Sequence, residues 1–113
     1  MGGAINNNRG VLTIIESTLY DNTGDLGGGA IYNREGEVAI TGSTLTENTA
    51  RSGGAIYNRE GRLTITDSSL TENTARSGGA IHNREGELTI ASSTLYDNTG
   101  DLGGGAIHNS EVS

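Results

Sequence analysis

Four acidic residues recur at nearly equal spacing and are the first candidates for chemistry in this chain: Asp21, Glu47, Glu72 and Asp97. Carboxylate oxygens are the ligands that Ca²⁺ prefers, so a row of them at one-repeat spacing can collect a hard cation. Asp25 and Asp101 lie in Gly-Asp-Leu-Gly stretches and are further weak Ca²⁺ candidates. A repeated acidic row also serves as a solvated face that keeps a protein soluble, and we favour that interpretation. We expect no bound metal, no cofactor and no catalytic residue.

A second row combines aromatic and imidazole side chains: Tyr32, Tyr57, His82 and His108. Such a row can bind a sugar, and histidines can bind a metal if a third ligand lies nearby. Only two histidines are present and no third ligand group accompanies them in the repeat. We therefore expect a stacked, solvent-facing ladder.

Both rows are products of a tandem repeat. Gly-Gly-Ala-Ile occurs five times, with steps of 26, 25, 25 and 26 residues between the isoleucines. A fixed step of this size is typical of a solenoid, in which each unit buries its apolar face against its neighbours. The longer steps arise in the Gly-Asp-Leu-Gly-Gly-Gly stretches, which contain one extra residue.

Within each repeat, aliphatic residues alternate with polar ones, as in half-buried strands. No helical stripe is present, so helical repeat families are excluded. Residues 54–58, 63–66 and 69–72 exemplify the three short strands expected in each coil. The predicted core consists of Ile5, Ile31, Ile56, Ile81, Ile107, Leu12, Val38, Leu63, Leu88, Ile14, Ile40, Ile65, Ile90, Leu19, Leu45, Leu70 and Leu95.

Asparagine also recurs in register, in two columns. In coils stacked at about 4.8 Å, an inward amide can bond to the amides above and below it. The predicted ladders are Asn7, Asn33, Asn58, Asn83, Asn109, and Asn22, Asn48, Asn73, Asn98. The Arg-Glu-Gly stretches at 34–36, 59–61 and 84–86 predict a turn in which glycine adopts a positive φ.

The fold predicted from these patterns is all-β: a parallel β-helix, or β-solenoid, of about 25 residues per coil and a little over four coils. We expect one repeat domain over residues 1–113, with coils at 2–27, 28–52, 53–77 and 78–103 and a partial coil at 104–113.

Gly-Gly-Ala-Ile followed by a Leu-x-x-Asn, such as residues 45–48, resembles the polymorphic outer membrane protein repeat. That family is usually written Gly-Gly-Ala-Ile plus Phe-x-x-Asn, and here Leu replaces Phe in all four copies. The resemblance implies a right-handed parallel β-helix of the kind found in autotransporter passenger regions. It also implies a secreted or cell-surface location and an adhesin-like role.

Composition excludes several partners. The net charge is −7, with 14 acidic residues against seven arginines, so the phosphate backbone of nucleic acid would be repelled. No apolar run approaches 18 residues, so we expect neither membrane insertion nor a signal peptide. Cysteine is absent, so neither a disulfide framework nor a redox compartment can be inferred.

The sequence leaves two further function classes as alternatives. β-Helix enzymes that act on polysaccharides place unique residues in irregular loops, whereas here each acid repeats in place and lysine is absent; a remnant of such an enzyme is one alternative. Ice binding is the other, because flat solenoid faces can carry threonine rows. The rows in this chain are interrupted at Ala39, Ile15 and Ala91. Our main hypothesis is therefore a non-catalytic structural scaffold.

The last two expectations concern the origin of the repeats and the ends of the chain. Residues 17–31 recur letter for letter at 93–107, which indicates an excised fragment, a designed idealised array or a recent amplification, the first two preferred. The repeat begins at Gly2 without an atypical capping segment. Open strand edges invite pairing, so we expect an end-to-end homodimer or short oligomer.

Overall fold

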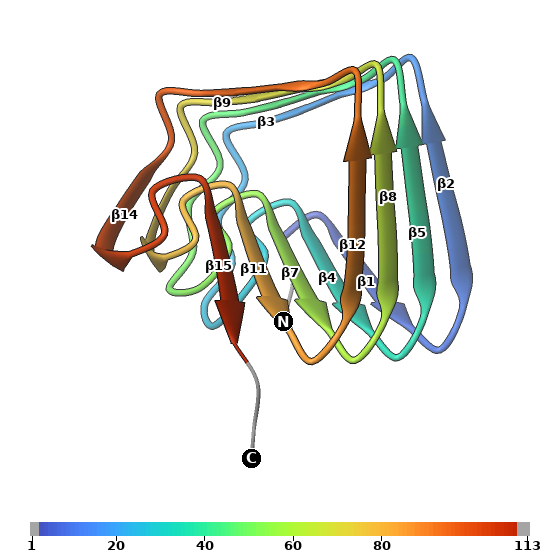
Figure 1. The fold of residues 1–113 in the computed structure, drawn as a ribbon, viewed down its shortest axis with the longest axis horizontal. Helices are drawn as coiled ribbons and strands as arrows, with labels where there is room; N and C mark the ends of the chain where they lie inside the picture. Colours follow the sequence, from blue (N-terminus) through green and yellow to red (C-terminus); the bar gives the residue numbers. More distant parts are fainter. Residues whose placement is uncertain (1–2, 111–113) are drawn as a thin grey trace.

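The computed structural model describes residues 3–110 and shows a parallel β-solenoid (Figure 1). The longest sheet stacks five strands, one from each coil: β1 (Ile5–Asn8), β4 (Ile31–Arg34), β7 (Ile56–Arg59), β11 (Ile81–Arg84) and β15 (Ile107–Ser110). Gly2 and residues 111–113, where the first and last predicted coils begin and end, lie outside the described residues.

Two four-stranded sheets form the other walls. The second sheet contains β2 (Val11–Ile15), β5 (Glu37–Thr41), β8 (Arg62–Thr66) and β12 (Glu87–Ala91). The third contains β3 (Thr18–Tyr20), β6 (Thr44–Thr46), β9 (Ser69–Thr71) and β13 (Thr94–Tyr96). Every pair in these sheets is parallel and in register, so each residue lies beside its counterpart one repeat away. The predicted all-β fold is confirmed.

A fourth short strand column was not predicted. β10 (Thr74–Ser77) pairs with β14 (Thr99–Gly103), and single bridges such as Thr23 to Thr49 continue the column through the earlier coils. The extra residue of the long stretch is absorbed here, because the register shifts between Ala75 and Ser77. After this column the chain turns back on itself before it enters the next coil, which gives the hooked outline in Figure 1. We call this part of each coil the hooked segment: residues 23–30, 49–55, 74–80 and 99–106.

The aliphatic columns lie inside the coils. Ile31, Ile40, Leu45 and their counterparts in the third coil are fully buried, together with the alanine of each Gly-Gly-Ala-Ile in the second to fourth coils. Predicted core residues of the outer coils are only partly buried: Ile5, Leu12, Leu19, Leu88, Ile90, Leu95 and Ile107. Full burial therefore requires a coil on each side, as expected for a solenoid.

The corners of each coil contain residues in the left-handed region, and here the glycine prediction was wrong. In the Arg-Glu-Gly turns the positive φ belongs to Glu35, Glu60 and Glu85, at 56° to 58°. The glycine that follows is needed for space instead. A Cβ on Gly61 would lie 2.6 Å from the Gly36 carbonyl oxygen and would also collide with the Asn33 amide.

Gly61 closely approaches the first asparagine ladder. Asn33 Nδ2 donates to Asn58 Oδ1 at 2.8 Å and to the Gly36 carbonyl at 3.0 Å. The same pair of bonds repeats from Asn58, so both amide hydrogens are used in each coil. One bond closes the turn and the other fixes the distance and register between coils.

The second asparagine ladder works from the opposite corner. Asn48 Nδ2 donates to Asn73 Oδ1 at 3.0 Å and to the Leu19 carbonyl of the preceding coil at 3.1 Å. A serine ladder that sequence analysis did not single out lies between the second and third sheets, where the Ser43 backbone amide donates to Ser68 Oγ. Its members are Ser17, Ser43, Ser68 and Ser93.

We predict that Gly61→Ala destabilises the protein more than Gly42→Ala. Gly42 has a positive φ of 58°, but a Cβ there would make only an ordinary contact with Glu16 Cγ at 3.6 Å, so alanine costs about 1 kcal/mol of backbone strain. At Gly61 the collision breaks ladder bonds, and overpacking with loss of a buried amide bond costs at least about 2 kcal/mol. Urea unfolding of both variants measures the difference. Equal midpoints would contradict the spatial role assigned to this glycine.

Candidate functional site

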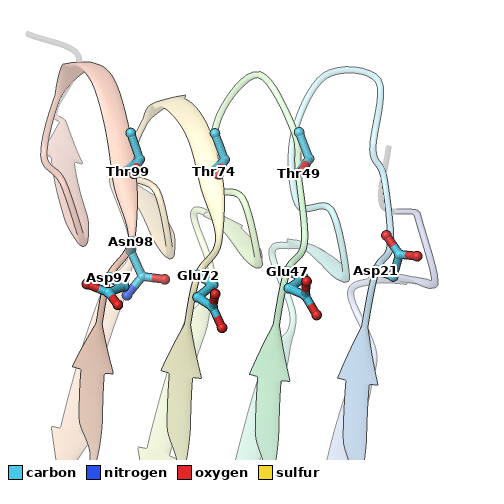
Figure 2. Close-up of a pocket in the computed structure, with 8 residues that line it drawn as sticks. All are labelled: Asp21, Glu47, Thr49, Glu72, Thr74, Asp97, Asn98 and Thr99. Atoms are coloured by element: carbon cyan, nitrogen blue, oxygen red, sulfur yellow. The ribbon is translucent and has the colours of Figure 1, made fainter.

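The predicted acidic row lines an open groove of about 730 Å³ along one corner of the solenoid (Figure 2). Figure 2 shows Asp21, Glu47, Glu72 and Asp97 side by side, one from each coil, immediately after the strands of the third sheet. Thr49, Thr74 and Thr99 form a parallel row above them. The groove is therefore lined by oxygen-bearing side chains at one-coil spacing.

The backbone gives these acids a structural role as well. Their φ angles are 54° to 57°, so each is the left-handed residue at its corner. Within residues 3–110, no three His, Cys, Asp or Glu side chains converge so that they could hold a metal ion. Asp25 and Asp101 are exposed and do not line the groove. The expectation that neither place binds Ca²⁺ stays a prediction.

The aromatic and imidazole row forms a continuous stack on the outer surface of the longest sheet. The rings of Tyr32 and Tyr57 meet edge to face at 5.3 Å between centroids, and His82 stacks on Tyr57 at 4.9 Å with an interplanar angle of 9°. His108 continues the stack at 4.8 Å from His82.

The expectation that this row faces solvent was wrong for His82, which is 9% exposed. The hooked segment packs against the column, since a Cβ at Gly27 would collide with the Tyr57 ring. His82 Nε2 lies 3.2 Å from Ser110 Oγ, while its Nδ1 is buried without a hydrogen-bond partner. Burial lowers the pKa of His82 to about 4, helped by His108 and Arg84 and opposed by the Ser77 backbone.

Charged rows on the solenoid are partly paired between coils. Arg9 Nε lies 2.7 Å from Glu35 Oε1, and this contact lowers the pKa of the Glu35 carboxyl. On the second sheet, Arg62 lies between Glu37 and Glu87, at 3.9 Å and 3.4 Å. On this sheet, Arg62 thus keeps the carboxylates of Glu37 and Glu87 from stacking directly on one another.

The threonine rows that suggested ice binding face outward but do not form a uniform lattice. Thr71 Oγ1 donates to Thr46 Oγ1 at 3.0 Å, so part of one row is engaged within the protein. Tyr20 and Tyr96, both 63% exposed, occupy the same row in the first and fourth coils. The second-sheet rows are interrupted by Ala39, Ile15 and Ala91.

Comparison with known families identifies the repeat. The model of the Chlamydia polymorphic membrane protein repeat matches residues 16–34, 42–59 and 67–84. Each match runs from the corner before the third sheet, through the asparagine and the hooked segment, to the first strand of the next coil. The chain is thus a parallel β-solenoid whose coils resemble polymorphic membrane protein repeats, as its motifs indicated. No curated protein and no solved structure matches the chain significantly.

We predict that millimolar Ca²⁺ leaves the melting temperature within about one degree of its value in EDTA, since a ligand stabilises only if it binds the folded state preferentially. Differential scanning fluorimetry measures this. A rise of several degrees would establish a site, and Glu47→Gln with Glu72→Gln, set against Asp25→Asn with Asp101→Asn, would assign it to the groove or to the long stretches.

We predict a loss of stability as the pH falls from about 6.5 to about 4, caused by His82. The unfolded histidine takes up a proton near pH 6.5, whereas the folded one resists protonation until about pH 4, so acid favours unfolding in this window. His82→Tyr, which repeats the residue of the preceding coil, should flatten the dependence between pH 6.5 and 5. Glu35 contributes only at lower pH, because its pKa is lowered. Equal slopes for both proteins in urea unfolding would refute this assignment.

Proposed function

We propose that the chain is a non-catalytic structural segment of an adhesin-like surface solenoid that self-associates through its first coil. The repeat match and the fold support a structural role, because members of each column have the same environment in successive coils. Near-identical copies favour an idealised array over a diversified natural passenger. A surface location follows from the resemblance to polymorphic membrane protein repeats.

A change of residue type in the first coil supports the proposed self-association. Val11 occupies the row that holds Glu37, Arg62 and Glu87 in the later coils, and it is 77% exposed. Ile15 occupies a row that holds threonine in the next two coils, and it is 57% exposed. Apolar side chains therefore replace polar ones on β2, which within the described part of the chain has a partner strand on one side only.

The strand arrangement favours a closed dimer over a filament. Among the described residues, β15 covers β11 at the other end of the stack, while β12 and β13 have one unpaired edge each. A second copy stacked head to tail would need its β1 at the place that β15 occupies. Two first coils related by a two-fold axis meet no such obstacle and hide the same apolar edge on both chains.

Light scattering over a concentration series tests the association. We expect a dimer at high micromolar concentration, and we expect Val11→Glu with Ile15→Thr, which restores the residue types of the later coils, to yield a monomer. Leu102→Glu is the matched control, because Leu102 is also 77% exposed but lies in β14. A monomeric wild-type protein, or a dimer that persists in the double variant, would refute association through the first coil.

A further inference from the structure

A small pocket of about 260 Å³ lies on the outer surface of the longest sheet and is distinct from the acidic groove. It is lined by Asn6 and Asn8 of β1, Tyr32 and Arg34 of β4, and Arg59 of β7. All five side chains come from positions that alternate with the buried isoleucine and asparagine columns. The pocket therefore opens away from the solenoid core.

The pocket exists because the first coil departs from its columns. Asn6 takes the position that aromatic or imidazole rings fill in the later coils, so no ring covers Tyr32 from that side. Asn8 likewise stands where the next three coils have arginine. Two shorter amide side chains leave room beside the Tyr32 ring and the Arg34 guanidinium.

One polar group of the pocket, in the Arg34 side chain, has no hydrogen-bond partner. This group is Nε, which is buried. A buried donor on a charged group is costly when it is left unpaired, and an anion that accepts from it removes this cost. Arg59 provides a second guanidinium in the same pocket, beside the Tyr32 hydroxyl, and the interaction with Tyr32 raises the pKa of Arg59.

The local charge favours an anion although the whole chain is acidic. Arg9, Arg34 and Arg59 lie near the turn carboxylates Glu35 and Glu60, and Glu35 is already paired with Arg9. Glu60 lies 4.0 Å from Arg59 Nε, which leaves the guanidinium of Arg34 without an ion-pair partner among the described residues. Arg34 and Arg59 also lower the pKa of the Glu35 carboxyl, but the close contact of Glu35 is with Arg9, so the Arg34 guanidinium still offers hydrogen bonds to an anion.

We propose that this pocket binds the carboxylate of an acidic sugar, such as a uronic acid residue of a surface glycan. Planar guanidinium groups match a carboxylate in geometry and charge. The Tyr32 ring offers an apolar face for the sugar ring, and the Asn8 amide can exchange hydrogen bonds with a hydroxyl group. An acidic peptide would satisfy the arginines alone and would leave the Tyr32 ring without a matched apolar partner. This inference rests on the adhesin-like part of the proposed function and supplies its ligand class.

Titration calorimetry and saturation-transfer NMR with sodium glucuronate test the site on the 113-residue chain. We expect binding of glucuronate, with glucose, acetate and triglutamate each at least about tenfold weaker. Arg34→Gln and Arg59→Gln should each weaken glucuronate binding roughly tenfold or more, as expected when a charge-assisted hydrogen bond is lost. Arg84→Gln is the matched control, because it removes the same charge from the same column but does not line the pocket.

Asn6→Tyr provides a second, independent test. It restores the aromatic residue of the column and fills the space beside Tyr32, so binding should disappear while the melting temperature is kept or raised. This variant decides the question if Arg34→Gln lowers stability. No binding of glucuronate, equal binding of acetate or triglutamate, or equal effects of Arg34→Gln and Arg84→Gln would each overturn the assignment. None of these variants changes Val11 or Ile15. A failure of the dimer prediction and a failure of the sugar-binding prediction can therefore be told apart.

Discussion

In-register hydrogen bonding between successive coils is the constraint on which this structure depends. At the corners, where left-handed residues interrupt the strands, the bonding continues: the Glu35 amide donates to the Arg59 carbonyl and the Glu60 amide to the Arg84 carbonyl, both at 2.9 Å. A left-handed residue other than glycine costs about 1 to 2 kcal/mol, and the chain contains such residues at repeated corners. Bonds on both sides of each inner coil, together with the amide ladders, hold these strained corners in place.

Exact register also means that every side chain meets its counterpart in the next coil. Aliphatic and amide columns gain from this, because methyl groups pack on methyl groups and each amide both donates and accepts. In a column of like charges the side chains repel one another. The chain reduces this repulsion by alternating the sign of the charge, as in Glu37, Arg62 and Glu87. The column of Arg34, Arg59 and Arg84 is not alternated, and the unpaired Nε of Arg34 arises within it.

Sequence periodicity was sufficient to predict which residues share a column, because a fixed step of 25 or 26 residues imposes the pairing. It did not reveal what lies beside each column. The sequence suggested that Gly61 is needed for a positive φ. The structure shows instead that the neighbouring amide ladder leaves no space for a side chain at this position. His82 looked exposed because strand alternation directs it away from the core, but it is buried beside Ser110 Oγ and the Ser77 backbone. Both errors concern contacts between segments that a repeat pattern read one strand at a time cannot show.

The proposed sugar site and the proposed dimer surface both lie at the first coil, because the repeat pattern is broken there. A residue that recurs in every coil provides the same surface several times and creates no unique site, whereas a departure from its column changes the shape at one place. Asn6 and Asn8 open a pocket where later coils have rings and guanidinium groups, and Val11 and Ile15 add apolar area where later coils are mostly charged or polar. These departures were visible in the sequence as breaks in the repeat. Their meaning required the structure, because only the stacked neighbours show whether a shorter side chain leaves a filled space or an open one.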